Sequence, residues 1–170
     1  MNILCTYPLL RRFEALLRER LGPGHGLTWL EPRDCEDPAW CFPDCEVLVT
    51  PRFPADWAPR FPALRLLHAV GAGIEKIDLA ALPAGARVCR TFGHGPSIAE
   101  FVLGAMLVLS RDLLAADRAL RAGRWLNPQY DPAVPLASLV GARTVVILGT
   151  GEIGASAASL CRRLGLTCVG

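Results

Sequence analysis

The 170 residues carry 18 basic and 16 acidic side chains, which are interspersed along the chain and leave a net charge of +2. Nucleic-acid binding calls for a stripe of one sign, so we expect no nucleic-acid partner. Hydrophobic residues make up 52% of the chain and charged residues 20%, which excludes a disordered chain and allows one full domain with part of a second.

The opening sequence MNILCTYPLLRR places its basic residues after the apolar run, which is not the order of a secretory signal peptide. The most apolar stretch, residues 98–109, contains Glu100 and is shorter than the roughly 20 residues that span a bilayer. The seven cysteines, an odd number, are typical of reduced thiols. We therefore expect a cytoplasmic protein with no membrane partner.

Three of the cysteines, Cys35, Cys41 and Cys45, gather in a proline-containing loop. Their spacing contains no CxxC pair, and no second pair of ligands that includes histidine accompanies them. We therefore expect thiols of the loop and no metal site.

The first half of the chain alternates short apolar runs with helical or turn-forming segments. Residues 9–22 place leucine and phenylalanine at helical spacing, which predicts an amphipathic helix. Unbroken apolar runs are typical of strands covered on both faces, so the order predicts an α/β fold with a parallel, doubly wound sheet. The predicted strands are residues 2–6, 27–30, 46–50, 64–70 and 86–91.

The longest helical pattern runs from Ser97 to about Ala122. Ser97 and Glu100 fit a capping box, with Ser97 as the N-cap, and Gly123 is a plausible stop. Asp117 and Arg121 have the i,i+4 spacing of an exposed face. A proline-containing linker follows this helix.

Near the C-terminus, Gly149, Gly151 and Gly154 form a G-x-G-x-x-G pattern between the apolar residues 144–148 and a helical segment at about 153–164. In a dinucleotide site the first glycine makes the tight turn, the second lets the backbone approach a pyrophosphate, and the third packs the helix on the strand. The phosphates lie on N–H groups at the helix N-terminus. The alternative interpretation is a purely structural glycine-rich turn that binds nothing.

Three segments in series resemble the D-isomer-specific 2-hydroxyacid dehydrogenases. They are GAGIEKIDLAAL, GHGPSIAEFVLGAMLVLSRDLLAADRALRAGRW and LVGARTVVILGTGEIGASAASLCRRLG. The resemblance covers residues 60–170 closely and the earlier part by element order alone. It implies a flavodoxin-like substrate domain at 1–96, a long interdomain helix at 97–126, a linker at 127–140 and an incomplete Rossmann domain at 141–170.

The resemblance also assigns site residues. Four loop residues would bind the substrate carboxylate through backbone N–H groups: Val70, Gly71, Ala72 and Gly73. The residues expected to bind NAD or NADP, with NAD favoured, are Ser97, Gly149, Thr150, Gly151, Glu152, Ile153 and Gly154. The substrate would be a small 2-oxo or 2-hydroxy acid, and a homodimer would form through the helix region 97–122.

The same resemblance places the catalytic arginine, glutamate and histidine of the family beyond Gly170. His94 lies in a glycine-flanked turn and is not the family's general acid, so we expect no catalytic residue within this chain. The chain is therefore expected to be the N-terminal portion of an NAD(P)-dependent oxidoreductase and inactive alone. Two alternatives stay open: a non-catalytic NAD-binding or dimerising regulatory relative, and a degenerate gene fragment.

Overall fold

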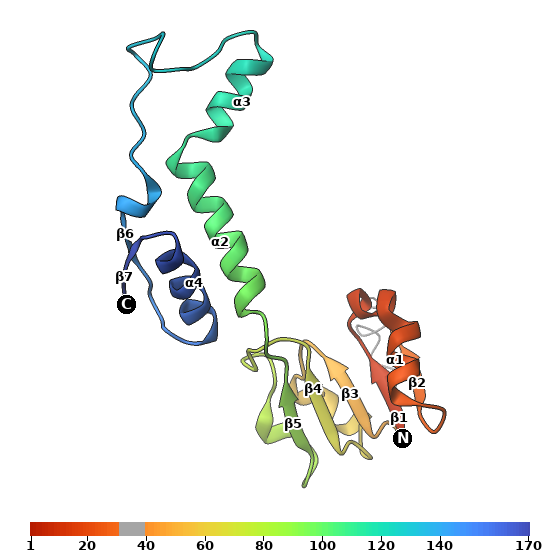
Figure 1. The fold of residues 1–170 in the computed structure, drawn as a ribbon. Helices are drawn as coiled ribbons and strands as arrows, with labels where there is room; N and C mark the ends of the chain where they lie inside the picture. The colour runs from red at the N-terminus through yellow and green to blue at the C-terminus, as the bar shows by residue number, and fades with distance from the viewer. Residues whose placement is uncertain (31–39) are drawn as a thin grey trace. The chain divides into compact units, whose positions relative to one another are not determined.

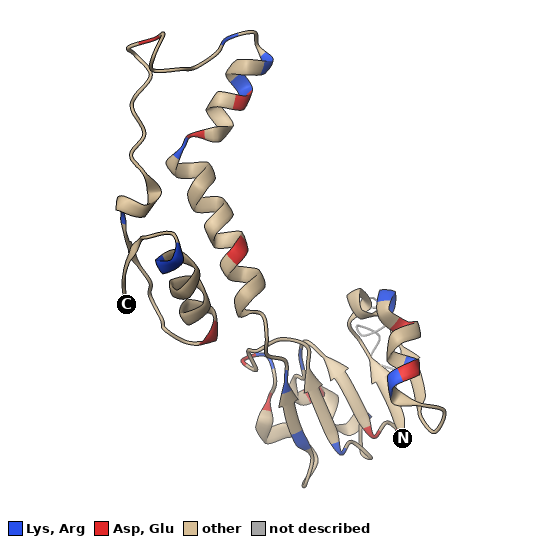
Figure 2. Ribbon diagram, in the orientation of Figure 1, with Lys and Arg blue, Asp and Glu red and all other residues tan. Residues whose placement is uncertain are grey.

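A computed structural model describes residues 1–30 and 40–170, and the chain divides into two compact units at residues 1–92 and 93–170 (Figure 1). Cys35 of the predicted cysteine cluster lies outside the described residues. Acidic and basic residues are interspersed over both units, and the helix that starts the second unit carries a single acidic residue, Glu100 (Figure 2).

The first unit is built on a five-stranded parallel sheet with the strand order β2-β1-β3-β4-β5. This is the flavodoxin-like order, so the predicted fold class is confirmed. All five predicted strands are present. Their bounds are β1 Asn2–Cys5, β2 Gly26–Trp29, β3 Val47–Thr50, β4 Leu66–Ala69 and β5 Arg87–Arg90.

Both faces of this sheet are covered. Leu4, Leu48 and Leu67 are aligned across β1, β3 and β4 and are almost fully buried against an aromatic cluster that includes Phe53 and Phe61. The alternate residues point to the opposite face, as the strand period of two requires. There Ile3, Cys5 and Val47 pack against Leu10, Leu17 and Leu21. This two-sided burial explains why the strands read as unbroken apolar runs.

The crossover segments are less helical than the sequence predicts. The single helix predicted at 9–22 is a 3-10 turn, η1 Pro8–Phe13, followed by α1 Glu14–Leu21. The connections after β3 and β4 contain only short 3-10 helices, η3 Ala55–Arg60 and η4 Leu79–Ala81. Pro59 inside η3 removes a backbone donor and limits that segment to a short turn.

The second unit begins with two helices, α2 Gly95–Ser110 and α3 Leu113–Arg121, where the sequence predicts one. The break lies at Asp112, which adopts a left-handed backbone with a φ of 47°. The predicted end of the helical pattern is confirmed, since Gly123 follows α3 with a φ of 74°. Asp117 and Arg121 form the predicted pair, with 2.9 Å between Oδ2 and Nε.

The predicted capping box at Ser97 is wrong. The helix α2 starts two residues earlier, with His94 at the N-cap and no capping hydrogen bond from its side chain. Pro96 explains the earlier start because its fixed φ suits the first turn and its missing N–H has no acceptor to lose there. Ser97 is therefore the third residue of the helix.

The chain then continues through residues 127–139, which contain turns only, to a βαβ unit. Its elements are η5 Val140–Ala142, β6 Thr144–Val146, α4 Glu152–Arg163 and β7 Thr167–Val169. The two strands pair in parallel, with Val145 opposite Cys168. This is the strand–turn–helix context that the glycine pattern requires.

Candidate functional site

The loop Val70–Gly73 lies at the carboxyl edge of the first unit's sheet, directly after β4. Its neighbours on both sides hold it, since the N–H of Val70 donates to the carbonyl of Thr50 (3.2 Å) and the N–H of Thr91 donates to the carbonyl of Gly71 (3.1 Å). The Val70 N–H is therefore committed to the sheet and is not free for a substrate.

The other three N–H groups of this loop, from Gly71, Ala72 and Gly73, have no acceptor in the part of the chain that the structure describes. Apart from its two chain neighbours, no residue places a heavy atom within 4 Å of where a Cβ on Gly71 would stand, so the space in front of this residue is open. The carboxylate of Glu75 lies beside Gly73, and the guanidinium of Arg90 donates to the carbonyl of Ala72 (3.5 Å). The three backbone donors and the Arg90 guanidinium favour binding of a carboxylate here, and the Glu75 carboxylate beside Gly73 opposes it.

His68 on β4 has a structural partner. The hydroxyl of Thr91 donates its single proton to the carbonyl of Ala69 (3.1 Å), so the 3.0 Å contact between Thr91 Oγ1 and His68 Nε2 needs the imidazole N–H as donor. This hydrogen bond secures the residue that follows β5 against β4. His94, the N-cap of α2, is half-buried and makes no capping bond.

In the second unit, the turn between β6 and α4 has the backbone that a pyrophosphate loop needs. Gly149 has a φ of 91°, which favours glycine. Gly151 is the N-cap of α4 and contributes no side chain to the cap, and its carbonyl accepts the first helical bond from the N–H of Ala155 (2.8 Å). A Cβ on Gly154 would collide with the carbonyl oxygen of Gly149, so this glycine packs the helix against the turn.

The first residues of α4, Glu152, Ile153 and Gly154, present N–H groups that an α-helix leaves without acceptors of its own. The helix dipole adds partial positive charge at the same end. Apart from its two chain neighbours, no residue places a heavy atom within 4 Å of the Cβ position on Gly151, so an anion can approach this backbone closely. The turn therefore fits the pyrophosphate of a dinucleotide.

The side chain of Glu152 points toward the start of α2. Its Oε1 accepts hydrogen bonds from the N–H groups of Gly93 (2.8 Å) and Gly95 (3.5 Å) at the start of α2. Sequence reasoning grouped Glu152 with the cofactor residues and missed both glycines. The residues next to Gly93 and Gly95 give no signal of a distant partner, and Glu152 lies 59 residues from Gly93 in the sequence.

A groove of about 540 Å³ runs between α2 and α4, and Ser97 is not among its lining residues. The structure thus brings the start of α2 and the glycine turn together through Glu152, while the loop Val70–Gly73 belongs to the other unit. The groove's lining residues are Pro96, Ala99, Glu100, Ala155, Ser156, Ser159, Leu160 and Arg163.

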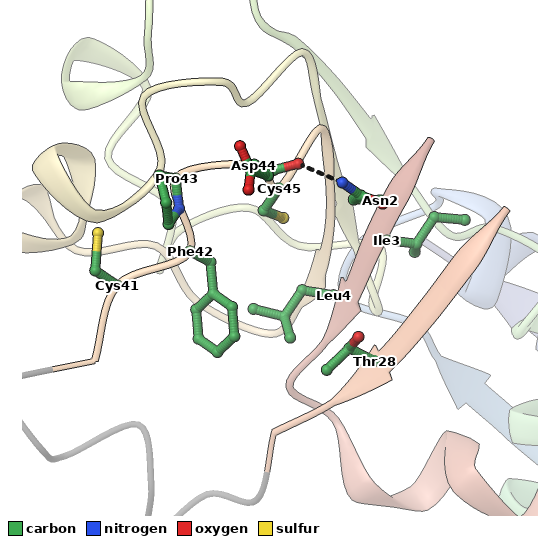
Figure 3. Close-up of a pocket in the computed structure, with 9 residues that line it drawn as sticks. All are labelled: Asn2, Ile3, Leu4, Thr28, Cys41, Phe42, Pro43, Asp44 and Cys45. Carbon is green, nitrogen blue, oxygen red and sulfur yellow. Dashed lines mark hydrogen bonds between the residues drawn. The ribbon is translucent and has the colours of Figure 1, made fainter.

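A smaller cavity of about 210 Å³ lies in the first unit, between the loop 41–45, the first three residues of β1 and Thr28 of β2 (Figure 3). The side-chain amide of Asn2 donates to the carbonyl of Asp44 at its rim (3.2 Å). Asn2 begins β1, so this rim of the cavity lies at the amino ends of the strands. Proteins of the α/β class bind their ligands at the other edge, outside the carboxyl ends.

The thiols around this cavity are not arranged as ligands. Burial raises the pKa of Cys45 to about 11, so this thiol stays protonated at neutral pH, while Cys41 is exposed. Over residues 1–30 and 40–170, no group of three or more His, Cys, Asp or Glu side chains is placed to hold a metal ion. Within the same residues, the helices are too short or too polar to cross a membrane.

Residues 103–170 match the family described as D-isomer specific 2-hydroxyacid dehydrogenase, NAD binding domain. Two curated relatives are a glyoxylate reductase of Aeropyrum pernix, 30% identical over 123 residues, and a D-3-phosphoglycerate dehydrogenase of Rattus norvegicus, 28% identical over 132 residues. These alignments cover 70% and 75% of this chain but only 37% and 24% of the relatives. The chain therefore spans between about a quarter and a little over a third of these two relatives.

Among solved structures, a D-isomer specific 2-hydroxyacid dehydrogenase family protein from Aeromonas salmonicida superposes with a TM-score of 0.76 at 20% identity. The match covers 98% of this chain and 52% of that protein. At this identity the likeness shows the fold, which is the one that the strand order predicts.

Proposed function

Because the chain belongs to the D-isomer specific 2-hydroxyacid dehydrogenase family, we propose that it supplies two anion-binding loops of an NAD(P)-dependent oxidoreductase acting on a D-2-hydroxy acid or the corresponding 2-oxo acid. One loop is the turn Gly149–Gly154, for the pyrophosphate. The other is the loop Val70–Gly73, for the substrate carboxylate. The observation that carries the proposal is the turn itself, with a left-handed Gly149, an open Gly151 and a Gly154 that leaves no room for a Cβ.

When bound, the dinucleotide supplies or accepts the hydride. The residues of this chain act on position and charge. The N–H groups at the start of α4 hold the pyrophosphate with the help of the helix dipole. The N–H groups of Gly71, Ala72 and Gly73 hold the carboxylate, and the guanidinium of Arg90 adds positive charge beside them.

No residue within 1–170 matches the arginine, glutamate or histidine to which the resemblance assigns the chemistry. We therefore propose that the polypeptide of residues 1–170 binds ligands without turnover. A steady-state assay with NADH and a panel of 2-oxo acids tests this, and any reproducible oxidation of NADH above the blank contradicts it.

The proposed dinucleotide binding is tested by calorimetric titration of the polypeptide with NADH, with NADPH and with ADP. Saturable binding of either reduced dinucleotide, together with competition by ADP, is expected. We expect NADH to bind more tightly than NADPH, and tighter binding of NADPH would contradict the preference for NAD. No saturable binding at millimolar concentration would contradict the proposal and favour a degenerate fragment.

We also propose that the chain forms a homodimer through residues 97–122. The support is that α2 and α3 expose large apolar side chains, with Phe101 and Leu109 each 77% exposed. Sedimentation velocity is expected to show a dimer that Phe101→Glu converts to a monomer.

We propose a cytoplasmic location as well, because the unpaired thiols of the described cysteines are typical of a reducing compartment.

A further inference from the structure

The start of α2 depends on a side chain from another helix. Its N-cap residue, His94, makes no capping hydrogen bond, and Pro96 occupies the first turn without an N–H. The carboxylate of Glu152 instead holds the backbone where the chain enters the helix. Its Oε1 accepts from Gly93, which precedes the N-cap, at 2.8 Å and, more weakly, from Gly95, the first residue of the helix, at 3.5 Å. A carboxylate at a helix N-terminus satisfies donors and opposes the helix dipole.

This contact is possible because α2 and α4 approach closely at their first turns. A Cβ on Gly95 would collide with the Oγ of Ser156 and would stand 3.1 Å from the carbonyl oxygen of Glu152. Gly95 is buried in this contact. Glu152 is also the first residue of α4, so one carboxylate lies near the N-termini of two helices at once.

The same residue occupies the second variable position of the turn proposed to hold the pyrophosphate. A carboxylate beside a phosphate is repulsive when both are partly removed from water. The hydrogen bond to Gly93 holds the carboxylate toward α2, while the backbone N–H of Glu152 stays at the mouth of the turn.

We propose that Glu152 is a positioning residue: its side chain joins the start of α2 to the pyrophosphate turn, and only its backbone serves the dinucleotide. The inference rests on the proposed function, because it assumes that a dinucleotide binds at Gly149–Gly154. It keeps Glu152 among the residues expected to bind the cofactor, through its backbone N–H alone.

The test compares Glu152→Gln, Glu152→Ala and Glu100→Ala in the 170-residue chain. Glutamine keeps an oxygen acceptor without the charge, whereas alanine removes both. Glu100 is a matched control, an exposed carboxylate on α2 that has no hydrogen-bond partner among the residues described. Two quantities are measured: amide exchange at Gly93 and Gly95 by ¹⁵N NMR, and the affinity for NADH.

We expect Glu152→Ala to lower protection at Gly93 about tenfold, as loss of one charged hydrogen bond implies, and to weaken NADH binding by about fivefold. Glu152→Gln should retain most of the protection and bind NADH within about twofold of the original chain, or more tightly. Glu100→Ala should change neither quantity.

Three results would overturn the proposal. Equal weakening of NADH binding by Gln and Ala, with Gly93 exchange unchanged, would make the carboxylate a cofactor ligand. Unchanged Gly93 exchange in Glu152→Ala would remove the cap. Faster exchange with unchanged affinity would leave a cap that positions nothing for the dinucleotide. If the original chain binds no NADH, the proposed function fails, and the exchange data still decide whether Glu152 holds the start of α2.

Discussion

Gly95 and Ser156 meet where α2 and α4 pack together, so closely that a Cβ at position 95 would collide with the hydroxyl oxygen at position 156. Gly95→Ala is therefore expected to lower the free energy of unfolding by about 1–3 kcal/mol, the usual cost of overpacking. Urea denaturation followed by the helical circular dichroism signal measures this change.

Gly104 on the same helix is the matched control. Apart from its chain neighbours and the backbone of its own helix, no heavy atom lies within 4 Å of its Cβ position, so Gly104→Ala should stabilise the helix by up to about 1 kcal/mol. Removing the hydroxyl as well, in Gly95→Ala with Ser156→Ala, should recover part of the loss. Similar effects of the two single alanine variants would argue against the close packing.

The glycines of the pyrophosphate turn are expected to separate folding from binding. Gly151→Ala fits the observed φ of −66° and meets no neighbour, so the free energy of unfolding should change by less than about 1 kcal/mol. The added methyl would occupy the approach of the phosphate and weaken NADH binding at least about tenfold.

Gly154→Ala should instead lower the stability of the fold, because its Cβ would collide with the carbonyl of Gly149. Loss of about 1–3 kcal/mol in stability is expected. Calorimetry with NADH and thermal unfolding of both variants provide the comparison. Undiminished NADH binding by Gly151→Ala would count against the turn as the pyrophosphate site.

A buried pair of hydroxyls joins β1 to β3 at the carboxyl edge of the sheet. Thr6 donates to Thr50 (2.9 Å), and Thr50 donates to the carbonyl of Arg52 (2.7 Å). Thr50→Val leaves both partners without their bonds, so a loss of about 1–3 kcal/mol is expected in urea denaturation. Thr28→Val, on the exposed surface of β2, should change stability by less than about 0.5 kcal/mol.

The buried thiol of Cys45 predicts a loss of stability in alkali. Burial raises the pKa of this thiol from the ordinary 9.0 to about 11, so the folded chain keeps a proton that the unfolded chain releases. The stabilisation is complete below pH 9 and is lost as the pH rises to about 11, with a slope of up to about 1.4 kcal/mol per pH unit. Unfolding by urea between pH 8 and 11 measures the slope, and Cys45→Ala should reduce it. An unchanged slope in that variant would assign the effect to other groups.

Local sequence patterns were sufficient for the parts of the fold that depend on local physics. The strand Val47–Thr50 was predictable because burial on both faces demands an unbroken apolar run. The break at Asp112 was not, since a left-handed aspartate is uncommon and the surrounding pattern continues as a helix. The pair Ser97 and Glu100 has the right spacing for a cap, yet Gly95 and Pro96 start the helix earlier.

The candidate site also contains some features that local sequence predicts and others that it does not. The turn Gly149–Gly154 follows from spacing and from the strand and helix that flank it. The roles of Glu152 and Val70 do not, because each depends on a partner distant in sequence, Gly93 and Thr50 respectively. The family resemblance could supply candidate positions, but it does not show which residues distant in sequence form hydrogen bonds, because the three-dimensional fold decides this.

The small sheet of β6 and β7 bears on how the polypeptide should be handled. Leu148 is completely exposed, and Val146 and Val169 are 77% and 53% exposed, beside strand edges with unpaired backbone groups. Such a surface promotes self-association through added strands as the concentration rises. Affinities for NADH should therefore be measured at several protein concentrations, and a constant value across the series would show that binding is not masked by aggregation.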